Sequence, residues 1–211
     1  MIVLAIDTCL NACSAAVVDG ERVLARRTEV MARGHQERLA PLVAEVMAEA
    51  GIAFEALDRI GVTVGPGSFT GLRVGLAFAK GLAAALDIPA VGIGTLEALA
   101  QPHGGVVIAV LDAKRGQVYL QGFADGRPVT APDVLPLETA AARVAELQPQ
   151  LLIGTGAELL SQIVHTATIN TADHLDSLAV ARLAATRSPT PPRPLYLRAP
   201  DARLPGGLLP P

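Results

Sequence analysis

Aromatic residues and cysteines are scarce in this sequence of 211 residues. Aromatic residues make up 3% of it and tryptophan is missing, although 51% of the residues are hydrophobic. The core must therefore consist mainly of Ala, Val, Leu and Ile. The only cysteines, Cys9 and Cys13, are too few for a disulfide framework, and no second pair completes a zinc site. We expect both to be small buried thiols.

The sequence also lacks an excess of basic residues. Its formal net charge is −3 and its isoelectric point is near 5.8, so the chain supplies no basic face for RNA. No charge-free apolar stretch reaches the roughly 18 residues of a membrane span. The apolar start has no positive region before it and breaks at Asp7, unlike a signal peptide. We expect a cytoplasmic protein without a membrane partner, in which another subunit holds any RNA.

The hydrophobic pattern of the first half is typical of an α/β protein. Residues 2–6 form an apolar run ended by Asp7, as in a central strand buried on both faces. Asp19-Gly20 provides the residues that a tight hairpin turn prefers. The pattern predicts strands at 2–6, 12–18, 21–28, 60–64 and 89–93, and helices at 34–50, 70–86 and 95–100.

This opening pattern returns after residues 101–105. Residues 106–111 are again apolar and are followed by Asp112. The distance in sequence from Asp112 to Asp125-Gly126 is nearly the same as that from Asp7 to Asp19-Gly20. The second half predicts strands at 106–111, 117–123, 151–153 and 195–198, and helices at 138–147, 157–162 and 172–187.

The repetition predicts a duplicated ββαβ unit. Such a pair of lobes is the layout of the actin, Hsp70 and sugar-kinase (ASKHA) superfamily. Coincidence is the alternative, because apolar strands that end in Asp are common in α/β proteins. We place the first lobe at 1–103, the second at 104–187, and a proline-rich tail that ends the compact structure at 188–211.

The segment Gly65 to Gly71, GPGSFTG, resembles a phosphate-binding loop but fails both standard spacings. A Walker loop needs GxxxxGK[ST], whereas Leu72 follows Gly71, and Thr70 occupies the last glycine position of GxGxxG. The turn after Asp7 also has no glycine to let backbone amides approach a phosphate closely. We interpret Asp7 as a residue that caps its strand, and Ser68 as a turn and capping residue.

Small residues recur every four positions in the helix predicted at 70–86. Gly71, Gly75, Ala79 and Ala83 form one stripe. Interior glycines such as Gly75 disfavour a helix by about 1 kcal/mol each relative to Ala, so the stripe indicates a close neighbour. That neighbour is either this protein's own sheet or a helix of another molecule, and the residues favour neither.

Metal sites and activated nucleophiles are not indicated. No two of the four histidines stand four positions apart, so neither HExxH nor HxxxH occurs. Ser68 lies between glycines without the spacing of a nucleophile elbow. Lys114 and Arg115 beside Asp112 suit a phosphate or an exposed hairpin tip equally well.

Several segments together resemble the TsaB (YeaZ) family. They follow the family's order along nearly the whole chain, and GPGSFTGLR and DAKRGQVY are specific motifs. The segments are LAIDT, HQERLAPLV, GPGSFTGLRVG, GLAAALDIPAVGIGTLEALA, DAKRGQVY and PLYLRAPDA.

The resemblance implies an ASKHA fold with a reduced second lobe and a role in making threonylcarbamoyladenosine beside the tRNA anticodon. In that family the catalytic subunit is a paralogue, TsaD, which carries an HxxxH metal motif, and the ATPase TsaE joins the assembly. This chain lacks the motif, so the resemblance implies a non-catalytic subunit that activates TsaD and meets tRNA only through the complex. It also implies that the complex uses ATP while this chain binds no cofactor or metal alone, and that the isolated chain forms a homodimer.

The resemblance places the interface with TsaD, or with a second copy, on the first two helices. The residues that we expect there are His35, Leu39, Leu42, Gly71, Arg73, Gly75, Ala79 and Ala83. A vestigial nucleotide site would comprise Asp7, Thr8, Asp112, Gly154 and Gly156. The alternative function is an ATP-binding enzyme of the kinase type that uses this second set; a peptidase would need metal ligands or a triad that the sequence lacks.

Overall fold

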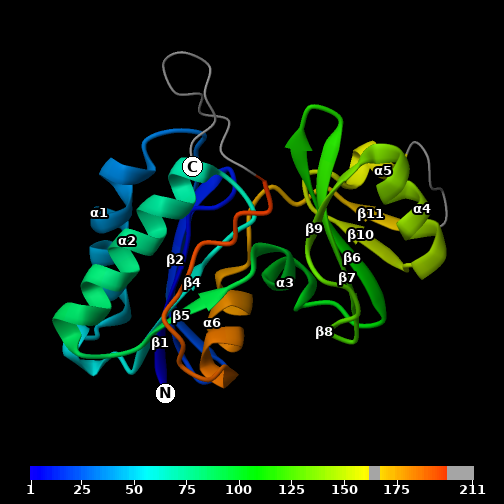
Figure 1. The fold of residues 1–211 in the computed structure, drawn as a ribbon. Coiled ribbons are helices and arrows are strands. Elements are labelled where there is room, and N and C mark those ends of the chain that lie inside the picture. Colours follow the sequence, from blue (N-terminus) through cyan, green and yellow to red (C-terminus); the bar gives the residue numbers. More distant parts are fainter. Residues whose placement is uncertain (162–166, 199–211) are drawn as a thin grey trace, which may run out of the picture.

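The computed structural model describes residues 1–161 and 167–198 and arranges them in two lobes (Figure 1). The first lobe is built on a sheet of five strands in the order β3-β2-β1-β4-β5. The hairpin strands β1, β2 and β3 are antiparallel, whereas β4 and β5 continue parallel to β1. The strands are β1 (Ile2–Asp7), β2 (Ala12–Asp19), β3 (Arg22–Val30), β4 (Arg59–Thr63) and β5 (Ala90–Ile93).

The sheet of the second lobe repeats this plan. Its order is β11-β10-β6-β7-β8, with β9 also paired to β7. The hairpin β6–β7 is antiparallel, and β10 and β11 run parallel to β6, as β4 and β5 do to β1. The predicted duplication and the α/β class are therefore confirmed. The strands are β6 (Val106–Lys114), β7 (Gln117–Ala124), β8 (Arg127–Pro128), β9 (Asp133–Pro136), β10 (Leu151–Ile153) and β11 (Thr168–Asn170).

Helices cover both faces of the first sheet. On one face α1 and α2 share a core with the strands, and on the other face α6 packs against β1, β2, β4 and β5. The short helix α3 lies between the lobes and contacts β6 and β7, whereas α4 and α5 belong to the second lobe (Figure 1). The helices are α1 (His35–Ala50), α2 (Phe69–Leu86), α3 (Thr95–Ala100), α4 (Leu137–Leu147), α5 (Ala157–Ser161) and α6 (Ser177–Thr186), with a 3-10 turn at Phe54–Ala56.

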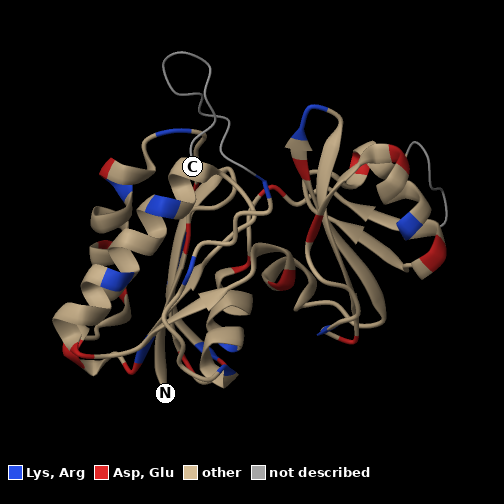
Figure 2. Ribbon diagram, in the orientation of Figure 1, with Lys and Arg blue, Asp and Glu red and all other residues tan. Residues whose placement is uncertain are grey.

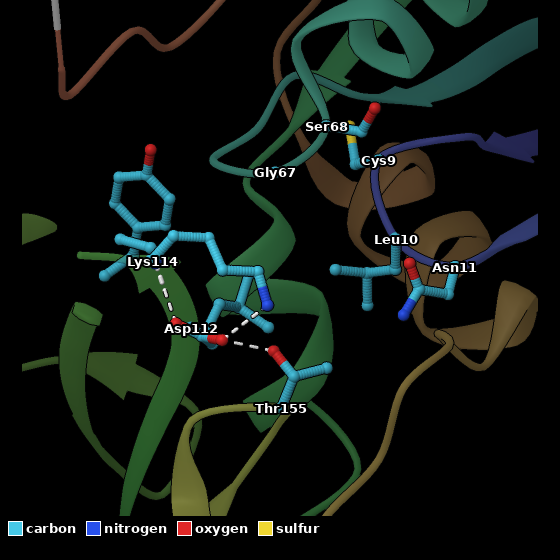
Figure 3. Close-up of a pocket in the computed structure, with 11 residues that line it drawn as sticks. Cys9, Leu10, Asn11, Gly67, Ser68, Asp112, Lys114 and Thr155 are labelled. Carbon is cyan, nitrogen blue, oxygen red and sulfur yellow. Dashed lines mark hydrogen bonds and ion pairs between the residues drawn. The ribbon is translucent and has the colours of Figure 1, made fainter. Parts of the chain in front are cut away.

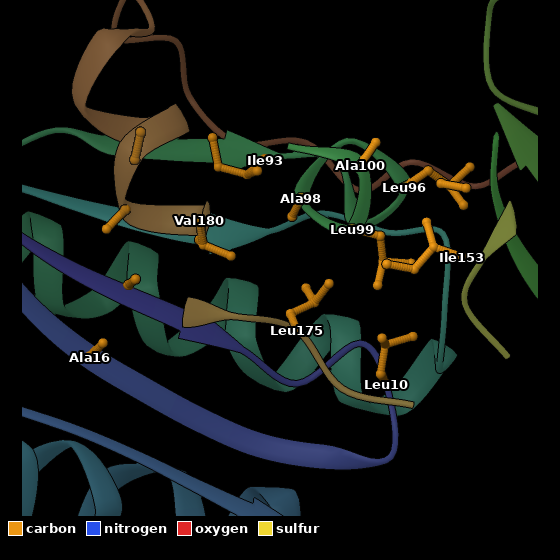
Figure 4. Packing of buried hydrophobic residues seen from close by; sticks show 14 of the residues in the cluster. Leu10, Ala16, Ile93, Leu96, Ala98, Leu99, Ala100, Ile153, Leu175 and Val180 are labelled. Carbon is orange, nitrogen blue, oxygen red and sulfur yellow. The ribbon is translucent and has the colours of Figure 1, made fainter. Parts of the chain in front are cut away.

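One hydrophobic core joins the two lobes (Figure 4). Leu96 and Leu99 of α3 pack in it with Val180 of α6 and with Ile153 of the second sheet. As the composition predicts, the members of this core are almost all aliphatic. Phe123 is the one aromatic residue among the largest fully buried side chains of the described residues.

The chain beyond the second lobe differs from prediction. The helix expected at 172–187 begins only at Ser177, where Asp176 accepts a hydrogen bond from Leu178 N at 3.0 Å and caps it. This helix, α6, belongs to the first lobe, because Arg59 of β4 donates to Ala184 O at 2.6 Å and the helix covers the first sheet. The boundary of the second lobe at residue 187 is therefore corrected.

Residues 188–198 also return to the first lobe. Pro192 is buried, and Leu195 N donates to Val64 O at 2.8 Å. The expected strand at 195–198 is not formed, and compact structure does not end at residue 188. Strands β8, β9 and β11 had not been predicted, and residue 162 of the helix expected at 157–162 lies outside the described part.

Candidate functional site

The turn between β1 and β2 is filled by the beginning of α2. Ser68 N donates to Cys9 O at 2.7 Å, and Ser68 Oγ caps the helix by accepting from Gly71 N at 3.2 Å. Because a Cβ at Gly67 would lie 2.3 Å from Cys9 O and one at Gly71 only 1.9 Å from Thr8 O, this approach requires glycine. Gly67 and Gly71 of GPGSFTG are therefore required for packing within this chain. The N-terminus of α2, which in other proteins can bind an anion, faces the β1–β2 turn instead.

Thr8 and Asp7 are turned into the protein. Thr8 Oγ1 donates to Gly71 O at 2.7 Å, while Asp7 Oδ1 accepts from Thr63 Oγ1 at 2.6 Å and from Cys9 N at 3.0 Å. Asp7 Oδ2 has no hydrogen-bond partner among the described residues. Burial raises the pKa of Asp7 above its ordinary value, against the opposing effect of the Thr63 hydrogen bond.

A cleft of about 380 Å³ lies between the two lobes (Figure 3). Its lining residues come from the β1–β2 turn, the start of α2 and the second sheet: Cys9, Leu10, Asn11, Gly67, Ser68, Leu111, Asp112, Ala113, Lys114, Tyr119 and Thr155. Asp112 accepts from Lys114 Nζ at 2.6 Å and from Lys114 N at 2.7 Å. Partial burial alone would raise the pKa of Asp112, but the hydrogen bonds from Lys114 outweigh it and hold the pKa below its ordinary value.

Of the residues predicted for a nucleotide site, the structure brings only Asp112 to the cleft. Asp7 and Thr8 face inward, and the turn Gly154 to Gly156 packs on β6. A Cβ at Gly154 would lie 2.3 Å from Val110 O, and one at Gly156 would lie 2.9 Å from Val110 Cγ2. Gly154 and Gly156 thus pack on β6, and the turn reaches the cleft only through Thr155 between them.

The small-residue stripe of α2 faces this chain's own sheet. Gly71, Gly75, Ala79 and Ala83 are all buried, and a Cβ at Gly75 would lie 2.5 Å from Thr8 Oγ1. The interpretation that this stripe admits a helix of another molecule is wrong, because the β1–β2 turn and the sheet already occupy that side.

The predicted residues on α1 are mostly internal too. Leu42 is fully buried, and His35 is buried with Nε2 3.2 Å from Ala12 O. Leu39 is also buried, although it forms part of the groove described next. Among all the residues predicted for the interface, Arg73 alone is exposed.

An apolar groove of about 500 Å³ runs between the outer faces of α1 and α2. It is lined by Gln36, Leu39, Ala40, Phe69, Thr70, Arg73, Val74, Ala77 and Phe78. The outer faces beside it are exposed and small, with Ala40, Ala44 and Ala48 on α1 and Ala77, Gly81 and Ala84 on α2. Sequence reasoning missed these outward-facing alanines and Gly81, although Arg73 and Lys80 lie on the same solvent-exposed face of α2.

The cysteines and the potential metal ligands of the described residues are dispersed or buried. Burial raises the pKa of the Cys9 thiol to about 12 and that of Cys13 to about 11, so both are buried, inert thiols as predicted. Within residues 1–161 and 167–198, no three His, Cys, Asp or Glu side chains gather closely enough to hold a metal.

By length and a mean hydropathy of 1.3, α2 is apolar enough to cross a membrane. The same helix carries Arg73 and Lys80 on its outer face, and its inner face packs on the first sheet. Core helices of soluble proteins have the same composition, so α2 by itself is weak support for a membrane span.

Comparison with known proteins identifies close relatives of the whole chain. A family model described as TsaD, tRNA N6-adenosine threonylcarbamoyltransferase, matches residues 23–147. An uncharacterised protein of Mycobacterium tuberculosis is 37% identical over 203 residues, which cover 95% of this chain and 93% of its own length. The tRNA threonylcarbamoyladenosine biosynthesis protein TsaB of Escherichia coli is 34% identical over 169 residues, covering 74% of this chain and 72% of its own length.

Solved structures give the same relationship at the level of the fold. A Pseudomonas aeruginosa protein, described as similar to the peptidase YeaZ, superposes with a TM-score of 0.80 at 30% identity over 93% of this chain and 99% of its own. The activator of a Clostridium difficile 2-hydroxyisocaproyl-CoA dehydratase, solved with bound ADPNP, has a TM-score of 0.55 at 11% identity over 88% and 93%. The second likeness concerns the fold alone and agrees with the predicted ASKHA architecture.

Proposed function

This chain belongs to the TsaB (YeaZ) family, and on that premise we propose that it is a non-catalytic docking subunit that binds and activates a TsaD-like transferase. The family takes part in the biosynthesis of tRNA threonylcarbamoyladenosine. The partner transfers the threonylcarbamoyl group to the adenosine next to the anticodon, and this chain stabilises the active form of the partner.

The observation that carries the proposal is the groove on the outer faces of α1 and α2. Its lining is apolar except for Gln36, Thr70 and Arg73, and Phe69 lies 42% exposed at one end. The exposed alanines and Gly81 beside it allow another helix to approach closely, as small residues do at helix contacts. A surface of this kind suits two helices of a partner packed against two helices here.

In the absence of the partner, the same groove suits a second copy of this chain. We propose that the homodimer and the heterodimer compete for α1 and α2. We further propose that a TsaE-like ATPase joins the assembly, that tRNA is held mainly by the transferase, and that the assembly works in the cytoplasm.

Ala77→Arg is expected to weaken association with the TsaD-like partner by at least a factor of 100, about 3 kcal/mol. The change places a long charged side chain in the groove, where docking would have to bury it. Calorimetry or surface plasmon resonance with the purified partner measures the effect. Ala145→Arg, at an exposed position of α4 in the other lobe, is the matched control and should bind normally.

In a reconstituted tRNA modification assay, the activity obtained with each variant should follow its affinity for the TsaD-like partner. The assay combines the TsaD-like and TsaE-like proteins, a threonylcarbamoyl-adenylate synthase, tRNA, and either this chain or its variants. We expect modification with the wild type and with Ala145→Arg, and little with Ala77→Arg or without this chain. Full turnover in its absence would contradict the proposal.

The isolated chain is expected not to bind MgATP at micromolar concentrations, which opposes the alternative function of a kinase-type enzyme. The phosphate-binding turn of such an enzyme would lie where Cys9 O and Thr8 O meet the start of α2. Asp112, the one predicted nucleotide residue that lines the cleft, is already paired with Lys114. Isothermal calorimetry with MgATP tests this, and micromolar binding with turnover would favour the enzyme instead.

A further inference from the structure

We infer that Arg73 is the specificity anchor of the docking groove and binds a carboxylate on a helix of the TsaD-like partner. This inference rests on the proposed function and adds the chemistry of the partner surface. It concerns one end of the groove, where Phe69, Arg73 and Tyr196 form an exposed stack.

The guanidinium of Arg73 is held in place on two sides. Its central carbon lies 3.8 Å from the centre of the Phe69 ring and 6.0 Å from that of Tyr196. The two rings lie 5.5 Å apart, and Arg73 Nε donates to Tyr196 Oη at 3.1 Å. Tyr196 is positioned in turn by the bond from Leu195 N to Val64 O. The side chain is thus ordered before any partner arrives.

The hydrogen bond to Tyr196 leaves the outer nitrogens of Arg73 available. Within the described part of the chain, Nη1 and Nη2 have no hydrogen-bond partner, and the side chain borders the groove. A guanidinium presents these two donors in a planar fork that matches a carboxylate. Because a stacked guanidinium has already lost rotamer freedom, the pair forms at a smaller entropic cost.

Charge complementarity identifies the partner surface as acidic at this point. Among the residues that the structure describes, Arg73 is the only charged one that lines the groove, and α2 carries basic but no acidic residues along its length (Figure 2). An apolar helix with one carboxylate at the corresponding position fits; a basic or phosphate-rich occupant such as RNA does not match the apolar remainder.

Phe69 and Tyr196 would remain exposed without such a partner. They are 42% and 44% exposed, respectively, and are among the few large hydrophobic side chains on the surface of the described residues. Docking of a helix over the stack would cover both rings and remove water from the ion pair, which strengthens it. Aromatic and arginine side chains in this arrangement are typical of the residues that dominate interface energetics.

The test is a charge-reversal cycle between this chain and its purified TsaD-like partner. We expect Arg73→Met, which keeps the apolar stem, to weaken binding at least tenfold and to reduce its dependence on salt, and Arg73→Glu to weaken it further. Changing the acidic residues of the partner's docking helices to Lys, one at a time, should identify one variant that restores binding to Arg73→Glu. Tyr196→Phe, which loosens Arg73 without removing its charge, should weaken binding severalfold while the salt dependence remains.

The outcomes separate this inference from the proposed function. Normal binding of Arg73→Met alongside loss of binding by Ala77→Arg would overturn the anchor and leave the docking role intact. Failure of every Lys variant of the partner to restore binding to Arg73→Glu would also overturn it. No binding of the partner by the wild type would overturn both.

Discussion

Gly71→Ala and Gly81→Ala are expected to change the stability of the chain in opposite directions. The two changes are chemically identical and lie in the same helix, α2. A Cβ at Gly71 would lie 1.9 Å from Thr8 O, a backbone atom, whereas a Cβ at Gly81 would have no heavy atom within 4 Å. Overpacking against backbone should lower the free energy of unfolding by about 3 kcal/mol in the first case. The second should raise it by about 1 kcal/mol, the difference in helix propensity.

For a chain of this length, these changes correspond to a fall in Tm of about 6–12 °C for Gly71→Ala and a rise of about 2–4 °C for Gly81→Ala. Thermal unfolding followed by circular dichroism measures both, and urea titration checks that the free energy of unfolding changes in the same sense. If Gly71→Ala raised Tm as Gly81→Ala should, the close contact between α2 and the β1–β2 turn would not exist in solution.

The strands and hairpins were predictable because their signals are local. Asp19-Gly20 and Asp125-Gly126 turn the two hairpins, and the runs that end at Asp7 and near Asp112 are the central strands β1 and β6. A two-residue period and a turn require no knowledge of the rest of the chain. The duplication followed from comparing the two halves by the same signals.

The orientation of α2 was not decided by its glycine stripe, because small residues occur on both sides of this helix. Gly71 and Gly75 face Thr8, whereas Ala77 and Gly81 face outward. Only the position of the β1–β2 turn distinguishes the two sides. That turn is more than 60 residues away in sequence, yet Thr8 Oγ1 donates a hydrogen bond to Gly71 O. The spacing of Arg73 and Lys80, seven residues apart on one face, was the signal that could have identified the solvent side.

Non-local packing also explains the errors at the end of the chain. The pattern of α6 does not reveal that it crosses back to the first sheet, where Arg59 binds its last turn. The first residue of α6 could have been predicted, because Asp176 before Ser177 is a favourable N-cap residue. The hydrophobic pattern alone placed the start of this helix too early. The short strands β8, β9 and β11 have two to four residues each, too few for a period to be recognised.

Asp7→Asn is expected to stabilise the chain at neutral pH and to have little effect in acid. Burial raises the pKa of Asp7 in the folded state, whereas in the unfolded chain the carboxyl titrates near 4. Between these two values the folded protein binds a proton that the unfolded chain has lost, so the free energy of unfolding falls as pH rises across this interval and then levels off. Each unit by which the pKa is raised corresponds to about 1.4 kcal/mol.

Asparagine keeps the acceptor Oδ1 for Thr63 Oγ1 and Cys9 N, and it imitates the uncharged carboxyl at Oδ2, which has no hydrogen-bond partner among the described residues. The variant should therefore match the wild type below pH 4 and exceed it by an amount that grows as pH rises above 4 and then levels off, as measured by urea unfolding at several pH values. Asp112→Asn is the matched control in the second lobe. The hydrogen bonds from Lys114 lower the pKa of Asp112, so that change should cost stability above about pH 4, and the cost should disappear as pH falls through the lowered pKa of the folded state. A loss of stability in Asp7→Asn that grows with pH would mean that the Asp7 carboxylate is ionised and paired in the folded protein, contrary to this expectation.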